Sequence, residues 1–207
     1  MRPSLVALAV GDEPAAWRGV GFAVDDDGCC RLGDVTVALG ADGRGIRGWA
    51  LDGADAAVDG LRTVEAPVTG ESASVHANGT VTIDHVVVTT PDLDRTVDAL
   101  VAAGLEPRRT RDAGEVTQVF FRVGGPILEV VGPTEPKPAE ATTVAASARF
   151  YGLALTVADL DATAEHLGER LGRVKDAVQP GRRIATLRRE AGLSTRIAVM
   201  SPEAARV

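Results

Sequence analysis

Two stretches of the chain share one order of apolar and polar positions. The first runs VVVTTPDLDRTVDAL after His85, and the second runs LALTVADLDATAEHL after Gly152. In each, a short apolar run precedes Asp-Leu-Asp, and apolar residues then recur at helical spacing. The pattern predicts a buried strand and an amphipathic helix, twice. Asp92 corresponds to Asp159, which sets the two copies 67 residues apart (159 minus 92).

Further strands are expected after each helix. The first copy continues with VTQVFFRVGG and PILEVVGP, and the second with RRIATLRREAG and STRIAVMSP. Pro133 and Pro202 close the two copies alike. At the start of the first helix, Thr90 is expected to be the cap and Pro91 the first helical residue. Each copy therefore predicts a strand, a helix and two or three more strands.

Two segments nearer the N-terminus show weaker similarity to this unit. CCRLGDVTVALG is similar to FFRVGGPILEVVG, and RGWALDGADAAVDGL is similar to YGLALTVADLDATAEHL. Residues 1–80 are therefore expected to be a degenerate relative of the unit, followed by complete copies at 81–135 and 149–207. The join between them, 136–148, is rich in Pro, Thr and Ala and is expected to be a linker.

Charge and composition narrow the classes of function. The formal net charge of −7 makes nucleic acid an unexpected partner, because binding it requires a basic surface. No apolar run approaches the ~20 residues of a membrane-spanning helix. No secretory cleavage pattern follows the short N-terminal apolar run, so we expect a cytoplasmic protein. The prevalence of Arg, Ala and Gly indicates a GC-rich, bacterial genome.

His85 is the polar exception at the head of an otherwise apolar strand. By strand alternation it shares a face with Val87 and Thr89. Glu129 also lies between apolar residues on one face of its strand, and a buried carboxylate needs a partner. An imidazole with a carboxylate suits iron, manganese, nickel or zinc. A lone histidine at a strand head is, however, more often a structural residue.

The ordered motifs resemble those of a known superfamily. A strand with Asp-His-Val, then Asp-Leu-Asp and a helix, then strands ending in Leu-Glu-Val, in tandem copies, is similar to the vicinal oxygen chelate superfamily. That group includes glyoxalase I-like lyases, extradiol dioxygenases and bleomycin-resistance-type binding proteins. The resemblance covers roughly 82–202.

This resemblance implies an α+β fold of tandem βαβββ modules. The modules would form curved mixed sheets around a cleft, with a degenerate N-terminal module in addition. It also implies metal ligands on the first and last strands of each module, which are the positions of His85 and Glu129. A homodimer is a further expectation, because relatives often complete their clefts by dimerising.

The second copy departs from the superfamily's ligand pattern. Moving His85 by the repeat offset leads to Gly152. Glu129 moves to Ala198 if the closing prolines are aligned, and to Arg196 with the unshifted offset. None of these residues binds metal. Two protein ligands remain where catalytic metal sites usually have three or four.

Other residues are candidates for completing the metal site or binding a ligand. Gln118, His76 or a residue of another subunit would have to supply the third metal ligand. Tyr151, next to Gly152, is a candidate ligand contact. Arg183 and Arg189 share one face of a predicted strand and would clamp a carboxylate or phosphate, with a solvated edge strand as the plainer alternative.

Two functions follow as hypotheses. The first is a glyoxalase-like lyase or isomerase, or a dioxygenase, in which a divalent metal on His85 and Glu129 stabilises an enediolate-like anion of a small organic substrate. Glu129 is the candidate catalytic residue and would alternatively act as a base. The second is a metal-free protein that binds or sequesters a small molecule, motivated by Gly152 and Ala198. A partner-binding module remains a third class.

Overall fold

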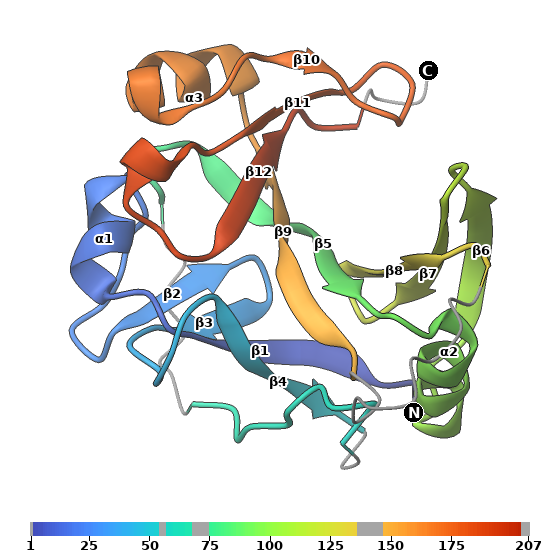
Figure 1. Cartoon of the computed structure of the whole chain (residues 1–207). Coiled ribbons are helices and arrows are strands. Elements are labelled where there is room, and N and C mark those ends of the chain that lie inside the picture. Colours follow the sequence, from blue (N-terminus) through green and yellow to red (C-terminus); the bar gives the residue numbers. More distant parts are fainter. Residues whose placement is uncertain (1, 54–56, 68–74, 136–146, 204–207) are drawn as a thin grey trace.

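A computed structural model describes residues 2–53, 57–67, 75–135 and 147–203 of the chain (Figure 1). An eight-stranded sheet has the order β10-β11-β12-β9-β5-β8-β7-β6, and a four-stranded sheet has the order β2-β3-β1-β4. The two complete sequence copies build the larger sheet, and the N-terminal residues build the smaller one. Within the described residues, no helix combines the length and hydropathy needed to cross a membrane.

Each complete copy is one βαβββ module. The first contains β5 (Thr80–Thr89), α2 (Leu93–Ala102), β6 (Pro107–Asp112), β7 (Val116–Arg122) and β8 (Ile127–Pro133). The second contains β9 (Arg149–Val157), α3 (Leu160–Leu167), the 3₁₀ turn η1 (Gly168–Arg170), β10 (Lys175–Asp176), β11 (Arg183–Thr186), the 3₁₀ turn η2 (Arg189–Ala191) and β12 (Arg196–Met200). In both, the first strand pairs in parallel with the last. Antiparallel pairing of β5 with β9 then joins the modules into one sheet.

The N-terminal residues form a shortened version of this unit. They contain β1 (Ser4–Val10), α1 (Pro14–Gly19), β2 (Cys29–Leu32), β3 (Val35–Ala38) and β4 (Ile46–Asp52). β1 pairs in parallel with β3, and β4 is antiparallel to β1 as β9 is to β5. The predicted fold class, tandem βαβββ modules with a degenerate N-terminal one, is therefore confirmed. The module boundaries stay predictions, and most of the proposed linker, 136–146, lies outside the described residues.

The Asp-Leu-Asp motif begins each module helix, and its first aspartate is the N-cap. The Asp92 side chain accepts a hydrogen bond from the Arg95 backbone N–H, and that of Asp159 accepts from the N–H groups of Asp161 and Ala162. The prediction that Thr90 is the cap was wrong by two residues. Its hydroxyl instead accepts from the Asp92 N–H at 3.1 Å, which fixes the turn before the helix.

One face of the larger sheet packs against the hydrophobic core. Val86, Val88, Leu128 and Val130 point to this face and are fully buried, as strand alternation predicts. The N-terminal strands lie beside β5 and β9 (Figure 1). Trp49 on β4 also meets Phe150 on β9, with ring centroids 5.5 Å apart. The N-terminal sheet thus covers the middle of the larger one.

The opposite face of the same strands is only partly covered. Its residues alternate with the buried ones, and most of their side chains are half-buried or exposed. We call this surface the open face; it comprises Arg111, Gln118, Phe120, Ile127, Glu129, Val131, His85, Val87, Thr89, Gly152, Arg196 and Ala198. It carries both residues of the predicted metal site, so it is where a ligand is to be sought.

The strand predicted around RRIATLRREAG is shorter than expected. β11 ends at Thr186. The Arg188 N–H then donates to the Arg170 carbonyl at 2.8 Å, which turns the chain toward η1 and into η2. Arg189 therefore lies in η2. The prediction that Arg183 and Arg189 share a strand face was wrong, because this contact between turns replaces the ladder.

Candidate functional site

A β-bulge brings two neighbouring side chains together on β5. Ile83 lies opposite Leu155 and His85 lies opposite Ala154, which leaves Asp84 as an extra residue in the ladder. A bulge of this kind rotates the extra side chain away from strict alternation. Nδ1 of His85 consequently lies 2.5 Å from Oδ1 of Asp84. Both side chains are largely buried.

Asp84 is itself held by the second module. Its Oδ2 lies 2.6 Å from a guanidinium nitrogen of Arg182 and accepts from the Thr156 hydroxyl at 2.8 Å. Nε of Arg182 donates to the Ser201 carbonyl at 2.8 Å, which fixes the guanidinium. Burial alone would raise the pKa of Asp84, but the hydrogen bonds from His85 and Arg182 outweigh it and hold that pKa well below its usual range. Asp84 is therefore a carboxylate.

An ionised Asp84 fixes both the orientation and the tautomer of His85. The carboxylate accepts from Nδ1, so Nδ1 carries the hydrogen. In the neutral ring Nε2 is then the basic nitrogen, and it is the one that remains for a ligand. The ring edge also meets Phe120 on β7, with centroids 6.2 Å apart. This is the arrangement of an oriented general base.

Glu129 lies next to this pair on β8. It is opposite Val87, two residues along β5 from His85 on the same face. Nε2 of Gln118 donates to Oε1 of Glu129 at 2.5 Å. Arg111 in turn donates to Oε1 of Gln118 at 3.4 Å. Burial raises the pKa of Glu129, and the attraction of His85 and the Gln118 hydrogen bond offset this only in part.

Together these residues form one polar row across the open face. Arg111, Gln118 and Glu129 come from β6, β7 and β8, while His85 and Asp84 come from β5. The row combines an oriented imidazole with a carboxyl group whose pKa is raised by burial. A basic ring nitrogen beside a carboxyl group suits general acid–base chemistry.

Strand register decides which residues of the second module occupy the equivalent places. In the first module Val87 lies opposite Glu129, and in the second Ala154 lies opposite Ala198. Since Val87 and Ala154 are one repeat offset of 67 residues apart, Ala198 is the counterpart of Glu129. The alignment on the closing prolines was therefore the correct one. The second module offers Gly152 and Ala198 where the superfamily places ligands.

The donor set does not fit a resident divalent metal. His85 and Glu129 are two ligands, and the counterpart positions carry no donor atom. Across the described ranges, no group of three His, Cys, Asp or Glu side chains is placed to hold an ion. His76 does not complete the set, because its Nδ1 accepts from the Ala23 N–H at 3.0 Å and its Nε2 lies 2.8 Å from the Arg31 carbonyl. Gln118 is engaged by Glu129.

The remaining predicted contacts lie in different places. Tyr151 is exposed, and its hydroxyl accepts from Arg196 at 2.7 Å. Arg183 forms a two-pronged ion pair with Asp161 on α3, at 2.8 and 3.0 Å, away from the polar row. Arg189 lies in η2. Their roles in ligand binding stay predictions, and the structure brings neither arginine to His85.

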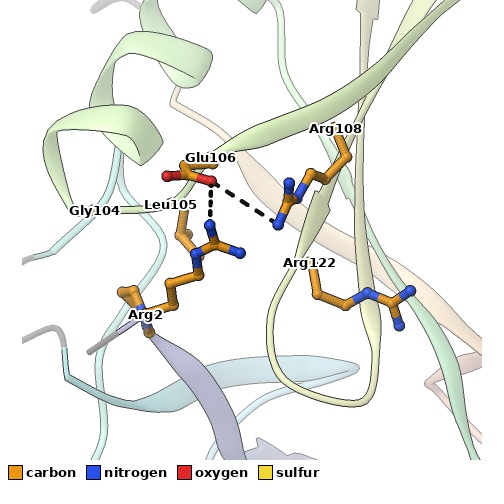
Figure 2. Close-up of a pocket in the computed structure, with 7 residues that line it drawn as sticks. Arg2, Gly104, Leu105, Glu106, Arg108 and Arg122 are labelled. Carbon is orange, nitrogen blue, oxygen red and sulfur yellow. Dashed lines mark ion pairs between the residues drawn. The ribbon is translucent and has the colours of Figure 1, made fainter.

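A groove at another part of the molecule contains none of these residues. Figure 2 shows Glu106 between Arg2 and Arg108, at 3.1 and 3.9 Å. Arg122, also on its wall, donates to the Gly125 carbonyl at 3.1 Å. The groove joins the start of β1 to the end of α2. Its charges are engaged with each other or with backbone, which is typical of a structural contact between elements.

Sequence reasoning missed three members of the site. Asp84 precedes His85 directly, but strict alternation puts neighbours on opposite faces, so only the bulge reveals the pair. Arg182 and Thr156 come from the second module, far along the chain. The one signal available was composition, since a run of arginines next to β11 indicated a positive group without specifying which residue is buried.

Residues 84–186, from the Asp84–His85 pair to the end of β11, match the family model described as Glyoxalase/Bleomycin resistance protein/Dioxygenase superfamily. The matched segment contains the polar row and the strands that hold it. This chain belongs to that superfamily. No curated protein matches the sequence.

Solved structures of the superfamily fold are similar to this chain at low identity. The methylmalonyl-CoA epimerase of Mycobacterium tuberculosis is 18% identical, with 61% of this chain and 91% of that one covered and a TM-score of 0.48. A variant of the Streptomyces coelicolor methylmalonyl-CoA epimerase, in complex with 2-nitronate-propionyl-CoA, is 22% identical over 59% and 97%, with a TM-score of 0.45. A hypothetical protein of Bacillus halodurans C-125 is 12% identical over 61% and 97%, with a TM-score of 0.47.

Proposed function

We propose that this glyoxalase-superfamily protein binds a small organic molecule on the open face and transfers a proton to and from it without a bound metal. The observation that carries the proposal is the Asp84–His85 pair beside Glu129. Nδ1 of His85 is held by a carboxylate, which leaves Nε2 as the nitrogen that can act as a base. Glu129, whose pKa is raised by burial, supplies a carboxyl group that can act as the acid.

The chemistry that these two groups support is an isomerisation. Nε2 of His85 accepts the proton of a carbon next to a carbonyl, and the electron pair of that C–H bond moves onto the carbonyl oxygen. Protonated Glu129 donates its proton to the resulting anion. The proton on His85 then passes to the Glu129 carboxylate, which restores both groups to their starting states. Atoms and charge balance without a co-reactant. Asp84 stabilises the imidazolium formed in the first step.

Hydrogen–deuterium exchange tests this step across whole classes of compound. The protein would be incubated in D₂O with 2-oxo acids, 3-oxo acids and acyl thioesters, and loss of each α-proton would be followed by NMR against a protein-free blank. We expect exchange of at least one compound class that persists with EDTA. His85→Gln and Glu129→Gln should each slow it by about 100-fold or more. His166→Gln, a change at an exposed histidine on α3, should leave it unchanged.

Two results would count against the proposal. Exchange that requires an added metal ion would instead support the hypothesis of a metal-assisted lyase or isomerase. Exchange that survives both His85→Gln and Glu129→Gln would remove these residues from the reaction.

Binding without turnover is the second candidate function. Two observations favour it. His85 is only 5% exposed to solvent, and Gly152 and Ala198, across the sheet, have no polar side-chain atoms. A sequestering protein would catalyse no exchange in the panel. A bound compound would instead raise its melting temperature by the same amount with and without EDTA.

A further inference from the structure

A second bulge places Tyr151 on the open face. Gly152 lies opposite Val87, and Phe150 lies opposite Val88, so Tyr151 is the extra residue of β9 at this point. Phe150 turns inward to Trp49. Tyr151 turns outward and contacts Arg196, which lies opposite Gly152 and belongs to the open face. A β-bulge on β9 thus brings Tyr151 to Arg196, as the β-bulge on β5 brings Asp84 to His85.

Tyr151 holds the Arg196 guanidinium in two ways. The guanidinium carbon lies 4.6 Å from the ring centroid, and one nitrogen donates to the hydroxyl at 2.7 Å. A stacked and hydrogen-bonded guanidinium has lost much of its rotational freedom before any ligand arrives. This bond uses one of the five N–H donors that a guanidinium carries. Preorganised donors of this kind suit planar, two-pronged recognition of a carboxylate.

Arg196 differs from Arg182 and Arg183, two arginines of the same module that have counter-ions. Arg182 is paired with Asp84, and Arg183 with Asp161. Within the described part of the chain, no carboxylate lies within ion-pairing distance of Arg196. The chain has a formal net charge of −7, so acidic partners are plentiful in general. An arginine that is held in place but left without one has its charge available to an anion.

The distance from Arg196 to the polar row suits a single small ligand. Across the sheet, His85 is followed by Ala154 and then Ala198, and Arg196 lies two residues from Ala198. Strand spacing and rise place the Cα atoms of His85 and Arg196 about 12 Å apart. Both side chains belong to the open face, so a ligand that spans this separation can meet both.

We propose that Arg196, stacked on Tyr151, binds the carboxylate of a small organic acid whose reacting carbon lies at His85 and Glu129. This assigns the substrate class and rests on the proposed function. It also replaces Arg183 and Arg189 by Arg196 as the anion-binding arginine. Arg149, exposed at the same end of β9 with Nε 3.4 Å from the Thr89 hydroxyl, adds positive charge beside the site.

The chain contains one tyrosine, which provides a selective probe. Protein labelled with ¹³C on the tyrosine ring gives signals from Tyr151 alone. It would be titrated separately with benzoate, with benzamide as the uncharged isostere, and with inorganic phosphate. We expect a saturable shift with benzoate, none with benzamide and a weaker response to phosphate. Arg196→Gln should weaken benzoate binding at least tenfold, and Arg196→Lys several-fold, because lysine keeps the charge but not the fork.

Arg122→Gln is the matched control, since it removes an exposed arginine on the wall of the other groove and should leave the titration unchanged. Titration calorimetry on the same variants measures benzoate binding without using the NMR signal of the Tyr151 ring, whose environment the Arg196 substitutions change. Equal binding of benzoate and benzamide, or unchanged binding by Arg196→Gln, would overturn the assignment. Tighter binding of phosphate than of benzoate would overturn the choice of a carboxylate.

The two proposals fail in different ways. If benzoate binds through Arg196 but no α-proton exchange is found, the anion site stands and the proton-transfer function fails. If exchange occurs with the same KM in Arg196→Gln as in the wild type, the function stands and the anion site fails.

Discussion

Arg196 lies directly opposite Gly152 in the parallel pair of β12 and β9, and its backbone fills the place of a side chain at that position. A Cβ added at Gly152 would lie 2.9 Å from the Arg196 Cβ and closer still to the Arg196 carbonyl oxygen. A ligand side chain at the counterpart of His85 is therefore disfavoured by packing as well as absent from the sequence. The asymmetry between the two modules is built into the strand pairing.

Gly152→Ala should destabilise the protein. Because the obstacle is backbone, the added methyl group forces β9 and β12 apart, and we expect a loss of about 1–3 kcal/mol in the free energy of unfolding. Urea denaturation measures it. Gly125→Ala is the matched control, since an added Cβ there meets nothing within 4 Å. A Gly152→Ala variant as stable as the Gly125→Ala variant would show that the strands adjust freely.

Adjacent arginines should differ sharply in their contribution to stability. Arg182→Met leaves the buried Asp84 carboxylate without its ion pair, which should cost about 3–5 kcal/mol. Arg183→Met removes a solvent-exposed ion pair with Asp161, which water and salt screen, and should cost far less. Thermal and urea unfolding of the two variants in parallel would give the comparison. Equal losses would mean that Asp84 finds another partner.

Acid should destabilise the protein through His76. Burial lowers the pKa of this histidine, whose Nδ1 accepts from the Ala23 N–H and so is unprotonated. The unfolded chain then takes up the proton first, at about pH 6.5. Stability is therefore complete above that pH and is lost as the pH falls toward the folded-state value.

Urea unfolding at several pH values between about 7.5 and 4.5 would reveal this loss. A His76→Gln variant should be less stable overall and should lose this fall toward acid pH; the raised pKa of Glu129 acts in the opposite direction, so that stability decreases as the pH rises. The lowered pKa values of Asp84 and Asp12 affect stability only below about pH 4, as those carboxylates protonate, so the windows are distinct. A wild type and a His76→Gln variant with parallel pH profiles would contradict the assignment.

Metal content is the remaining prediction. Since Gly152 and Ala198 supply no ligands, we expect far less than one ion per chain by mass spectrometry, even after incubation with iron, manganese, nickel and zinc. His85→Ala should have the same content as the wild type. One ion per chain that is lost in His85→Ala would mean that Gln118 or a residue of a partner subunit completes the set.

The sequence by itself determined the modular plan. Asp92 and Asp159 start the two helices through local hydrogen bonds, and apolar alternation buries Leu128 and Val130, so these features can be predicted from neighbours along the chain. Alternation from His85 onward and along β8 also predicts which neighbours share a face with His85 and with Glu129, and the parallel pairing of β5 with β8 then puts these two faces on the same side of the sheet.

Only the tertiary structure decided which groups those residues meet. The bulges at Asp84 and Tyr151 depend on the pairing of β5 with β9, and an extra residue in a ladder reverses the face that alternation predicts. Of the neighbouring arginines, Arg182 is buried against Asp84, whereas Arg183 pairs with Asp161 on α3. Local pattern fixes strands and helices, whereas a site assembled from several strands depends on their register, which only packing sets.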